Sequence, residues 1–202
     1  MYQDQTYSNV RVPANRHALF RNCTFQDVLY IDCSKTSASK SNANNIRFED
    51  CTFNGVIVTR VPQPFNWMNN CLYFTGTATF NNQSAVQEAT ILAPHFNVNL
   101  GNTNPEHTDS NVLTGAIVGG IVDIRGNAQI YGTIISMFDT SRYPSGYVTN
   151  IGATLGDGGS VTTEVGDVGV IGITPKQDMM LPSGITSPII IDPNERTYSE
   201  SV

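Results

Sequence analysis

The sequence predicts an all-β protein: a single-stranded parallel β-helix, a solenoid of stacked coils that we expect to be right-handed. Three observations predict this class. Two similar segments lie 28 positions apart, short alternating runs are separated by turn residues, and helical spacing never persists beyond about two turns. We expect the coils over residues 1–138. Residues 139–202 are expected to form an irregular cap and tail, because a solenoid must cover its open end.

The internal repeat begins at Phe20. Residues 20–31 align without a gap with residues 48–59, sharing a Phe, a Cys-Thr-Phe triplet and a following apolar run. A third, weaker copy is expected at residues 68–74, and a polar insertion at residues 34–44 accounts for the unequal offsets. Self-similarity at such a period is typical of solenoids, which accept insertions at the corners of their coils.

Stacked coils place equivalent side chains above one another in ladders. One internal ladder is expected from Cys23, Cys51 and Cys71. A second, of the same parity, is expected from Phe25, Phe53 and Tyr73. Each Cys is preceded by a residue that tolerates the left-handed conformation of a sharp corner, namely Asn22, Asp50 and Asn70.

The middle of the chain continues the strand pattern. Residues 90–92 and 96–100 read as strands around a Pro-His corner. Val118, Ile124 and Ile130 then recur every six residues, each followed two positions later by Gly. A six-residue period also suggests a left-handed hexapeptide β-helix. We favour further coils of the same helix, with a corner at residues 126–127.

Composition excludes several functional classes. The formal net charge is −6 and Lys and Arg do not cluster, which argues against nucleic acid and anionic membrane surfaces as partners. No apolar run is long enough to span a bilayer. The four cysteines form no Cys-x-x-Cys pair and have no His at zinc spacing, which argues against a metal site through sulfur. We expect free buried thiols, with a bridge between Cys23 and Cys33 as the alternative if coil corners bring them together, and we expect no metal and no cofactor.

Two stretches carry a family resemblance: the Asn-Cys-Thr-Phe run at residues 22–25, and Ile-x-Gly-Asn-Ala-x-Ile-x-Gly-x-Ile-Ile at residues 124–135. Together they resemble the soluble β-helical domain of bacterial type IV pilus-associated, minor-pilin-like assembly proteins, over residues 18–138. The chain is more widely similar to right-handed β-helices such as pectate-lyase-like proteins and phage tailspikes. The resemblance implies an extracytoplasmic location and pilus or cell-envelope partners, which requires a leader or membrane anchor outside this sequence.

Polysaccharide-active β-helices suggest one kind of chemistry. Hydrolysis needs two carboxylates, and a lyase needs a base with Ca²⁺. The candidate acids are Asp27, Asp32, Glu49, Asp50, Asp123 and Asp139. The candidate bases are Arg47, Arg60 and Arg125. No two acids recur in register, and Asp32 aligns with Arg60, so we interpret these residues as surface charges that pair across coils.

Other catalytic or metal chemistry has weaker support. None of His17, His95 and His107 lies beside an evident nucleophile. Acidic residues between 156 and 167 could supply oxygens to Ca²⁺, but they fit no calcium-binding repeat. Asp-Gly pairs of this kind mostly mark turns.

One aromatic cluster favours binding. Phe65, Trp67 and Tyr73 follow a Pro-rich corner, where an exposed Trp67 could stack on a sugar ring or anchor a protein. The alternative is that Trp67 packs over a coil corner. We therefore predict a non-enzymatic extracytoplasmic surface or binding module. A carbohydrate-active (lyase- or hydrolase-like) or glycan-binding protein is the alternative, and a scaffold that polymerises end to end is a third possibility.

Overall fold

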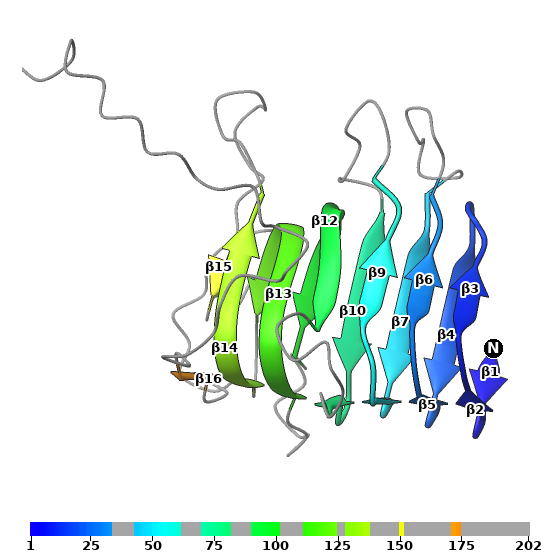
Figure 1. Ribbon diagram of the computed structural model, residues 1–202, viewed down its shortest axis with the longest axis horizontal. Helices are drawn as coiled ribbons and strands as arrows, with labels where there is room; N and C mark the ends of the chain where they lie inside the picture. Colours follow the sequence, from blue (N-terminus) through cyan, green and yellow to red (C-terminus); the bar gives the residue numbers. More distant parts are fainter. Residues whose placement is uncertain are drawn as a thin grey trace, which may run out of the picture.

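The computed structural model describes residues 1–33, 43–61, 70–81, 90–101, 111–124, 128–137, 150–151 and 171–174. Within these ranges every regular element is a β-strand, and the strands form one 16-stranded sheet. All strand pairs given by its register are parallel. The sheet is strongly curled around a common interior (Figure 1). The predicted all-β, parallel architecture is therefore confirmed.

The sheet consists of three stacks of parallel strands, which the chain visits in turn. The first stack runs through β1 (Tyr2–Gln3), β4 (His17–Arg21), β7 (Asn45–Glu49), β10 (Cys71–Thr75), β12 (Ile91–Leu100), β13 (Asn111–Ile124) and β15 (Asn150–Ile151). The second runs through β2 (Thr6–Tyr7), β5 (Thr24–Phe25), β8 (Thr52–Phe53), β11 (Thr79–Phe80), β13, β14 (Ala128–Ser136) and β16 (Ile171–Thr174). The third joins β3 (Val10–Val12), β6 (Leu29–Ile31) and β9 (Ile57–Thr59) to parts of β12, β13 and β14. The long strands β12 to β14 contribute to more than one stack because they continue through a corner.

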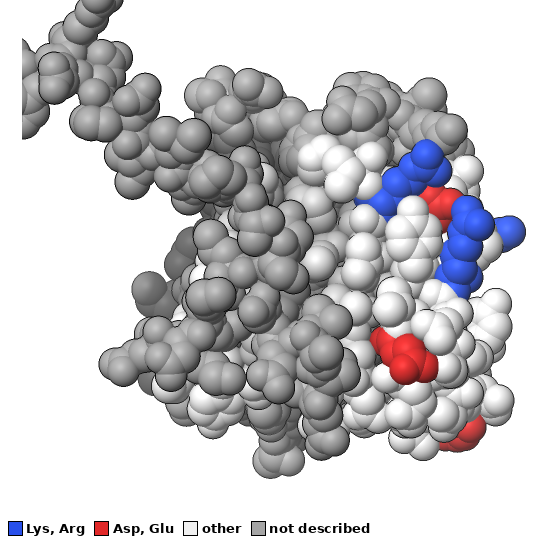
Figure 2. Space-filling view, in the orientation of Figure 1, with Lys and Arg blue, Asp and Glu red and all other residues white. Residues whose placement is uncertain are grey.

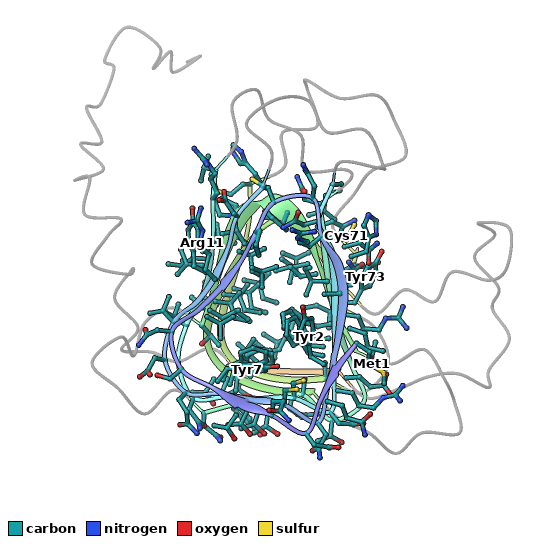
Figure 3. The ribbon with its side chains drawn as sticks, turned by 90° about the vertical axis from the view of Figure 1, so that its right-hand side faces the viewer. Met1, Tyr2, Tyr7, Arg11, Cys71 and Tyr73 are labelled. Atoms are coloured by element: carbon teal, nitrogen blue, oxygen red, sulfur yellow. The ribbon has the colours of Figure 1, made fainter. Side chains whose placement is uncertain are left out.

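Two ladders of stacked aromatic rings fill much of the interior (Figure 3). The first stack contributes Tyr2, Phe20, Phe48 and Phe74, with ring centroids 4.9, 5.5 and 5.2 Å apart. The second contributes Tyr7, Phe25, Phe53 and Phe80, with centroids 5.5, 5.1 and 4.8 Å apart. Rings of one ladder meet those of the other edge-on, at 5.2–6.1 Å. Each such contact is worth about 0.5–1.5 kcal/mol beyond the area it buries, so these ladders hold successive turns in register.

The corner between the first and second stacks uses left-handed backbone. Asn22 and Asp50 have φ of 50° and 54°, as their residue types predict, and Asp4 has 55° in the turn before them. Gly76, with φ of 66°, takes this position in the next turn. A side chain at Gly76 would also collide with the Asp50 carboxylate, which comes within 2.3 Å of the site of a Cβ.

The third copy of the repeat lies six residues further on than predicted. Phe48 pairs with Phe74 and Phe53 with Phe80, so the copy is residues 74–80 and Ala78 holds the cysteine position. Two residues, Gly76 and Thr77, replace the single Asp50, and this insertion hides the match from a gap-free alignment.

This shift corrects two of the expected ladders. Cys23 and Cys51 do occupy equivalent buried positions, and Phe25 stacks on Phe53. Cys71, however, pairs with Asn45. Tyr73 pairs with Arg47 instead of continuing the line of Phe25 and Phe53. Because side chains alternate along a strand, Cys71 and Tyr73 point to the outer side of β10, opposite the buried Leu72 and Phe74.

Contrary to the prediction, Asn70 does not lie at the corner of Asn22 and Asp50. It precedes β10, at the corner between the third and first stacks, and its equivalent in the previous turn is Asn44. The Asn70 side-chain oxygen accepts a hydrogen bond of 2.9 Å from the Asn44 backbone N–H. The Asn44 side-chain oxygen in turn accepts one of 3.1 Å from the Arg16 N–H. Two buried asparagines therefore tie this corner together across successive turns.

The later turns follow the same stacks. Residues 91–100 form the single strand β12, and the predicted Pro-His corner is an irregularity in its pairing between Ala93 and Asn97. Val118 pairs with Ile135, Ile124 with Ile151 and Ile130 with Leu113, so the six-residue pattern belongs to stacked strands of the same sheet. β15 and β16 add to the first and second stacks beyond residue 138. The rest of residues 139–202, and with it the expected cap, lies outside the described residues.

Candidate functional site

The predicted aromatic cluster is only partly described. Phe65 and Trp67 lie outside the described residues, whereas Tyr73 projects from the outer side of β10 and is half-buried. The Arg47 guanidinium carbon lies 5.5 Å from the centre of the Tyr73 ring, a cation–π distance. Burial raises the pKa of Tyr73 to about 12, and the neighbouring Cys71 contributes further. Tyr73 is therefore a neutral phenol at physiological pH.

Cys71 and its strand neighbour Asn45 complete this group on the first stack, and Figure 3 shows Cys71 beside Tyr73 on the outside of the sheet. The side chains of Cys71 and Asn45 both hydrogen-bond the Tyr73 phenol. Cys71 is only 7% exposed, and its burial raises the pKa of its thiol. A buried thiol of this kind is a weak nucleophile, because the thiolate is the reactive form. The group is suited to contact a ligand through the Tyr73 ring, the Asn45 amide and the Arg47 guanidinium.

The three other cysteines are free and buried, as predicted. Burial raises the pKa of Cys33 to about 11 and that of Cys51 to about 12. The Cys23 and Cys51 thiols each lie 3.3 Å from the carbonyl oxygen two residues earlier, on Arg21 and Glu49. These thiols therefore act as small buried side chains with a local backbone acceptor.

An ion-pair ladder crosses three turns at the end of the third stack. Asp32 lies between two arginines, with its oxygens 2.7 Å from Arg11 Nη2 and 3.2 Å from Arg60 Nη1. The hydrogen bond from Arg11, followed by that from Arg60, lowers the pKa of Asp32 against the opposing effect of burial. The predicted pairing of Asp32 with Arg60 is confirmed. Figure 2 shows basic side chains gathered around an acidic one at the right of the molecule, near β3 and β6.

The remaining described acids of the first three turns also have partners. Glu49 accepts two hydrogen bonds from Arg21, of 3.1 and 3.2 Å. Asp27 accepts one from the Ser8 hydroxyl, and Asp50 accepts one of 2.9 Å from the Thr77 N–H. Of the later candidates, Asp123 lies on β13 in register with Asn99, whereas Arg125 and Asp139 lie outside the described residues.

Histidines and metal ligands add no further site in the described part of the chain. His17 is exposed at the start of β4, and His95 is half-buried within β12. His107 and the acidic residues between 156 and 167 fall outside the described ranges. Among the described residues, no three His, Cys, Asp or Glu side chains lie close enough together to hold a metal ion.

The most regular surface, which sequence reasoning missed, is the outer side of the second stack. Four successive turns place a threonine there, in register: Thr6, Thr24, Thr52 and Thr79. Beside them runs an amide ladder, in which Asn54 Nδ2 donates to Gln26 Oε1 at 3.1 Å and Asn81 Nδ2 donates to Asn54 Oδ1 at 3.3 Å. We call these seven residues the threonine face. A recurring Thr-aromatic dipeptide, at Thr6-Tyr7 and three later positions, is the signal in the sequence that marks it.

Thr6, Gln26 and Asn81 of the threonine face are exposed and its other residues are half-buried, and the face carries neither Arg nor Lys. Neighbouring strands are about 4.8 Å apart. The face therefore presents hydroxyl, methyl and amide groups at a constant repeat along the axis of the stacks. It can donate and accept hydrogen bonds at every turn.

Comparison with known proteins found no match: no family model, no curated protein and no solved structure is significantly similar to the chain. The resemblance to pilus-associated proteins therefore has no support from these comparisons. No helix among the described residues is long and apolar enough to cross a membrane.

Proposed function

We propose that the chain is a right-handed parallel β-helix. The order in which the chain visits the three stacks supports this, because each visit adds one strand to each stack. Viewed with the N-terminal turn nearest, the chain passes Tyr2, Tyr7 and Arg11 clockwise as it recedes (Figure 3). That sense corresponds to a right-handed path, the hand strongly favoured for connections between parallel strands.

We further propose that this β-helix is a non-enzymatic surface or binding module. The observation that carries the proposal is the engagement of the described acids: Asp32, Glu49, Asp27 and Asp50 each have a basic, hydroxyl or backbone partner. A glycosidase needs two carboxylates facing one bond at a defined separation, one of them free to carry a proton. Carboxylates that already bind partners on neighbouring turns are better suited to a structural role than to glycoside hydrolysis.

The proposed binding surface is the threonine face, with the Tyr73 group on the adjoining first stack as a second contact. Both belong to stacks whose register is fixed by the aromatic ladders, so their groups are preorganised for a ligand. Phe65 and Trp67 remain proposed members of the Tyr73 group.

The proposed location is extracytoplasmic, on a type IV pilus or the cell envelope, with an envelope protein, a pilus protein or a glycan as partner. The resemblance of residues 18–138 supports this location. Fractionation of the source cells with an antibody to the chain tests it, because recovery in the cytoplasm alone would contradict it.

A glycan-binding or carbohydrate-active protein is the second candidate, and the threonine face favours its binding form. Sugar hydroxyls both donate and accept hydrogen bonds, as the Thr hydroxyls and amide side chains do. A polysaccharide laid along the axis would meet equivalent groups at each turn.

The experiment is a panel of polysaccharides and envelope fractions assayed for binding and for cleavage with the same protein. The module predicts saturable binding without new reducing ends or unsaturated products, whereas turnover would overturn it in favour of an enzyme. A Thr24→Val, Thr52→Val double variant should weaken binding about tenfold or more, since two hydrogen-bonding hydroxyls are lost. Thr133→Val, an exposed change on β14, is the matched control. Equal binding by all three proteins would remove the threonine face from the proposal.

A further inference from the structure

The ion-pair ladder at the end of the third stack holds two arginines on one carboxylate. The Asp32 side chain is only 9% exposed, and its two oxygens lie 2.7 Å from Arg11 Nη2 and 3.2 Å from Arg60 Nη1. The Cys33 backbone N–H donates to the same carboxylate at 3.0 Å. Asp32 is therefore fixed by the backbone beneath it, and it holds both guanidinium groups at one place on the surface. We call Arg11 and Arg60 the arginine pair.

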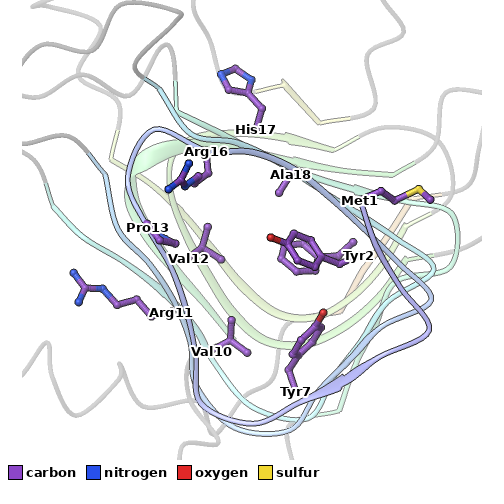
Figure 4. Close-up of a pocket in the computed structure, with 11 residues that line it drawn as sticks. Met1, Tyr2, Tyr7, Val10, Arg11, Val12, Pro13, Arg16, His17 and Ala18 are labelled. Carbon is purple, nitrogen blue, oxygen red and sulfur yellow. The ribbon is translucent and has the colours of Figure 1, made fainter.

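Most hydrogen-bond donors of the arginine pair are available to a ligand. A guanidinium has five N–H donors, and among the described residues the side chains of Arg11 and Arg60 donate to Asp32 alone. The Arg11 side chain is 69% exposed and that of Arg60 is 34% exposed. Figure 4 shows Arg11 projecting away from the interior, whereas Val10 and Val12 point inward. The pair can therefore donate further hydrogen bonds toward solvent while it stays bound to Asp32.

The charge at this place is positive although the chain as a whole is acidic. Two arginines and one carboxylate leave a local charge of +1, whereas the formal net charge of the chain is −6. At physiological ionic strength, exposed charges more than about 8 Å apart are largely screened. A ligand at the arginine pair therefore meets the local cation, and one monoanionic group balances it. The planar fork of Arg matches the geometry of such an oxyanion.

An aromatic side chain lies beside the arginine pair. Tyr30 is in register with Arg11, and Val58 follows it on the next strand. Both point to the outer side of the third stack and are half-buried. Neighbouring strands are about 4.8 Å apart, so the Tyr30 ring lies within reach of a ligand held by Arg11. Such a ring combines an apolar face with a polar tip, which suits the C–H face of a sugar ring.

We propose that the arginine pair and Tyr30 form a binding site for an acidic saccharide. The carboxylate or sulfate ester of the saccharide accepts hydrogen bonds from both guanidinium groups on their solvent side, and its ring packs on Tyr30. This inference rests on the glycan-binding form of the proposed function, and it names the charge of the glycan. It involves neither the threonine face nor the Tyr73 group, which lie on the other two stacks.

The probes are trigalacturonic acid for the carboxylate and a sulfated galactose trisaccharide for the sulfate ester. Calorimetry with the full chain is expected to give saturable binding of at least one of them, and the one that binds identifies the anionic group. The uncharged counterparts, methyl-esterified trigalacturonic acid and the unsulfated trisaccharide, should bind at least about tenfold more weakly, because charge-assisted hydrogen bonds are lost. No saturable binding of either acidic probe, or equal binding of its uncharged counterpart, would overturn the proposal. Equally tight binding of triglutamate would also overturn it, because the ligand would then be an acidic peptide.

On the protein side, Arg11→Gln should weaken binding of the acidic probe at least about tenfold. Arg21→Gln is the matched control, because it removes the same charge from a half-exposed arginine that pairs with Glu49 on the first stack. Tyr30→Ser should weaken binding about two- to tenfold through loss of the ring contact. Circular dichroism establishes that the variants keep the fold. Equal weakening by Arg11→Gln and Arg21→Gln would refute the site, since overall charge would then explain the binding.

The Thr24→Val, Thr52→Val double variant separates this site from the threonine face. It should bind the acidic probe as the wild type does, because neither hydroxyl lies on the third stack. If the double variant loses the probe and Arg11→Gln keeps it, the arginine site is wrong and the threonine face stands. If Arg11→Gln alone loses the probe, the arginine site stands whatever the threonine face binds.

Discussion

Replacing Asn44 with alanine removes the amide that links three segments at the corner between the third and first stacks. Its Nδ2 donates to the Asp32 carbonyl at 2.5 Å and to the Pro13 carbonyl at 3.3 Å, and its Oδ1 accepts from the Arg16 N–H at 3.1 Å. The Asn44 side chain is fully buried, and Asp32 is 6% exposed. In the variant, water can therefore bind the exposed Pro13 carbonyl and Arg16 N–H in place of the Asn44 amide more readily than it can bind the Asp32 carbonyl.

The magnitude follows from these three bonds. An unpaired buried carbonyl at Asp32 costs about 1–3 kcal/mol, and each of the two more accessible bonds contributes about 0.5–1.5 kcal/mol net. Together these contributions predict a loss of about 2–6 kcal/mol in the free energy of unfolding. With a urea m-value near 2 kcal/mol/M, the midpoint should fall by about 1–3 M.

The assay is urea unfolding followed by far-UV circular dichroism, with Asn54→Ala as the matched control. Asn54 makes the same kinds of bond, but to the exposed amides of Gln26 and Asn81, so its loss should cost less than about 1 kcal/mol. Asn44→Asp keeps the side-chain volume and a hydrogen-bond acceptor but loses the donor. Its urea midpoint should therefore lie closer to that of Asn44→Ala than to that of the wild type. If Asn44→Ala and Asn54→Ala shift the midpoint equally, the assignment of the corner to buried hydrogen bonds is wrong.

Three further outcomes are expected. Gly55→Ala should destabilise by about 1–3 kcal/mol in the same assay, because its Cβ would lie 1.9 Å from a backbone oxygen of the preceding turn; an unchanged midpoint would contradict this contact. Cys33 and Cys51 should react with a thiol reagent only slowly in the native protein at pH 8, and all four thiols should react in denaturant, because burial raises the pKa of both thiols and excludes the reagent. The Asp32→Asn variant should be less stable than the wild type above pH 4, and the difference in unfolding free energy should narrow as the pH falls, because the lowered pKa of Asp32 gives stability that protonation removes. A difference that does not change with pH would show that the interaction of Arg11 with the Asp32 carboxylate is not its cause.

The repeat could be predicted from the sequence where it is free of insertions. Residues 20–31 and 48–59 align because each position meets its equivalent directly, and the structure pairs Thr24 with Thr52 and Phe25 with Phe53. The third copy was missed because one extra residue at Gly76 and Thr77 shifts Phe80 out of a gap-free alignment. Pattern alone therefore favoured residues 68–74, whose Asn-Cys pair mimics the true repeat.

The candidate site was less predictable, for a physical reason. Whether Cys71 faces in or out depends on the register of β10, and a slip of one residue moves every side chain to the other side of the strand. Asn44 and Asn70 look like ordinary turn residues, and only their stacking across turns reveals buried hydrogen bonds. By contrast, the pairing of Asp32 with Arg60 follows from the 28-residue offset alone, since opposite charges at equivalent positions of neighbouring turns lie side by side.

The inner and outer ladders of the second stack are set by the same dipeptide. Because successive side chains point to opposite sides of a strand, each Thr-aromatic pair places a ring inside and a hydroxyl outside. Stacking Phe25 on Phe53 at 5.1 Å thereby aligns Thr24 with Thr52. A slip that disordered the outer row would have to break the aromatic packing as well, at about 0.5–1.5 kcal/mol for each ring contact. The regularity of the threonine face is therefore maintained by the core beneath it, and this connects the packing of the interior to the proposed binding surface.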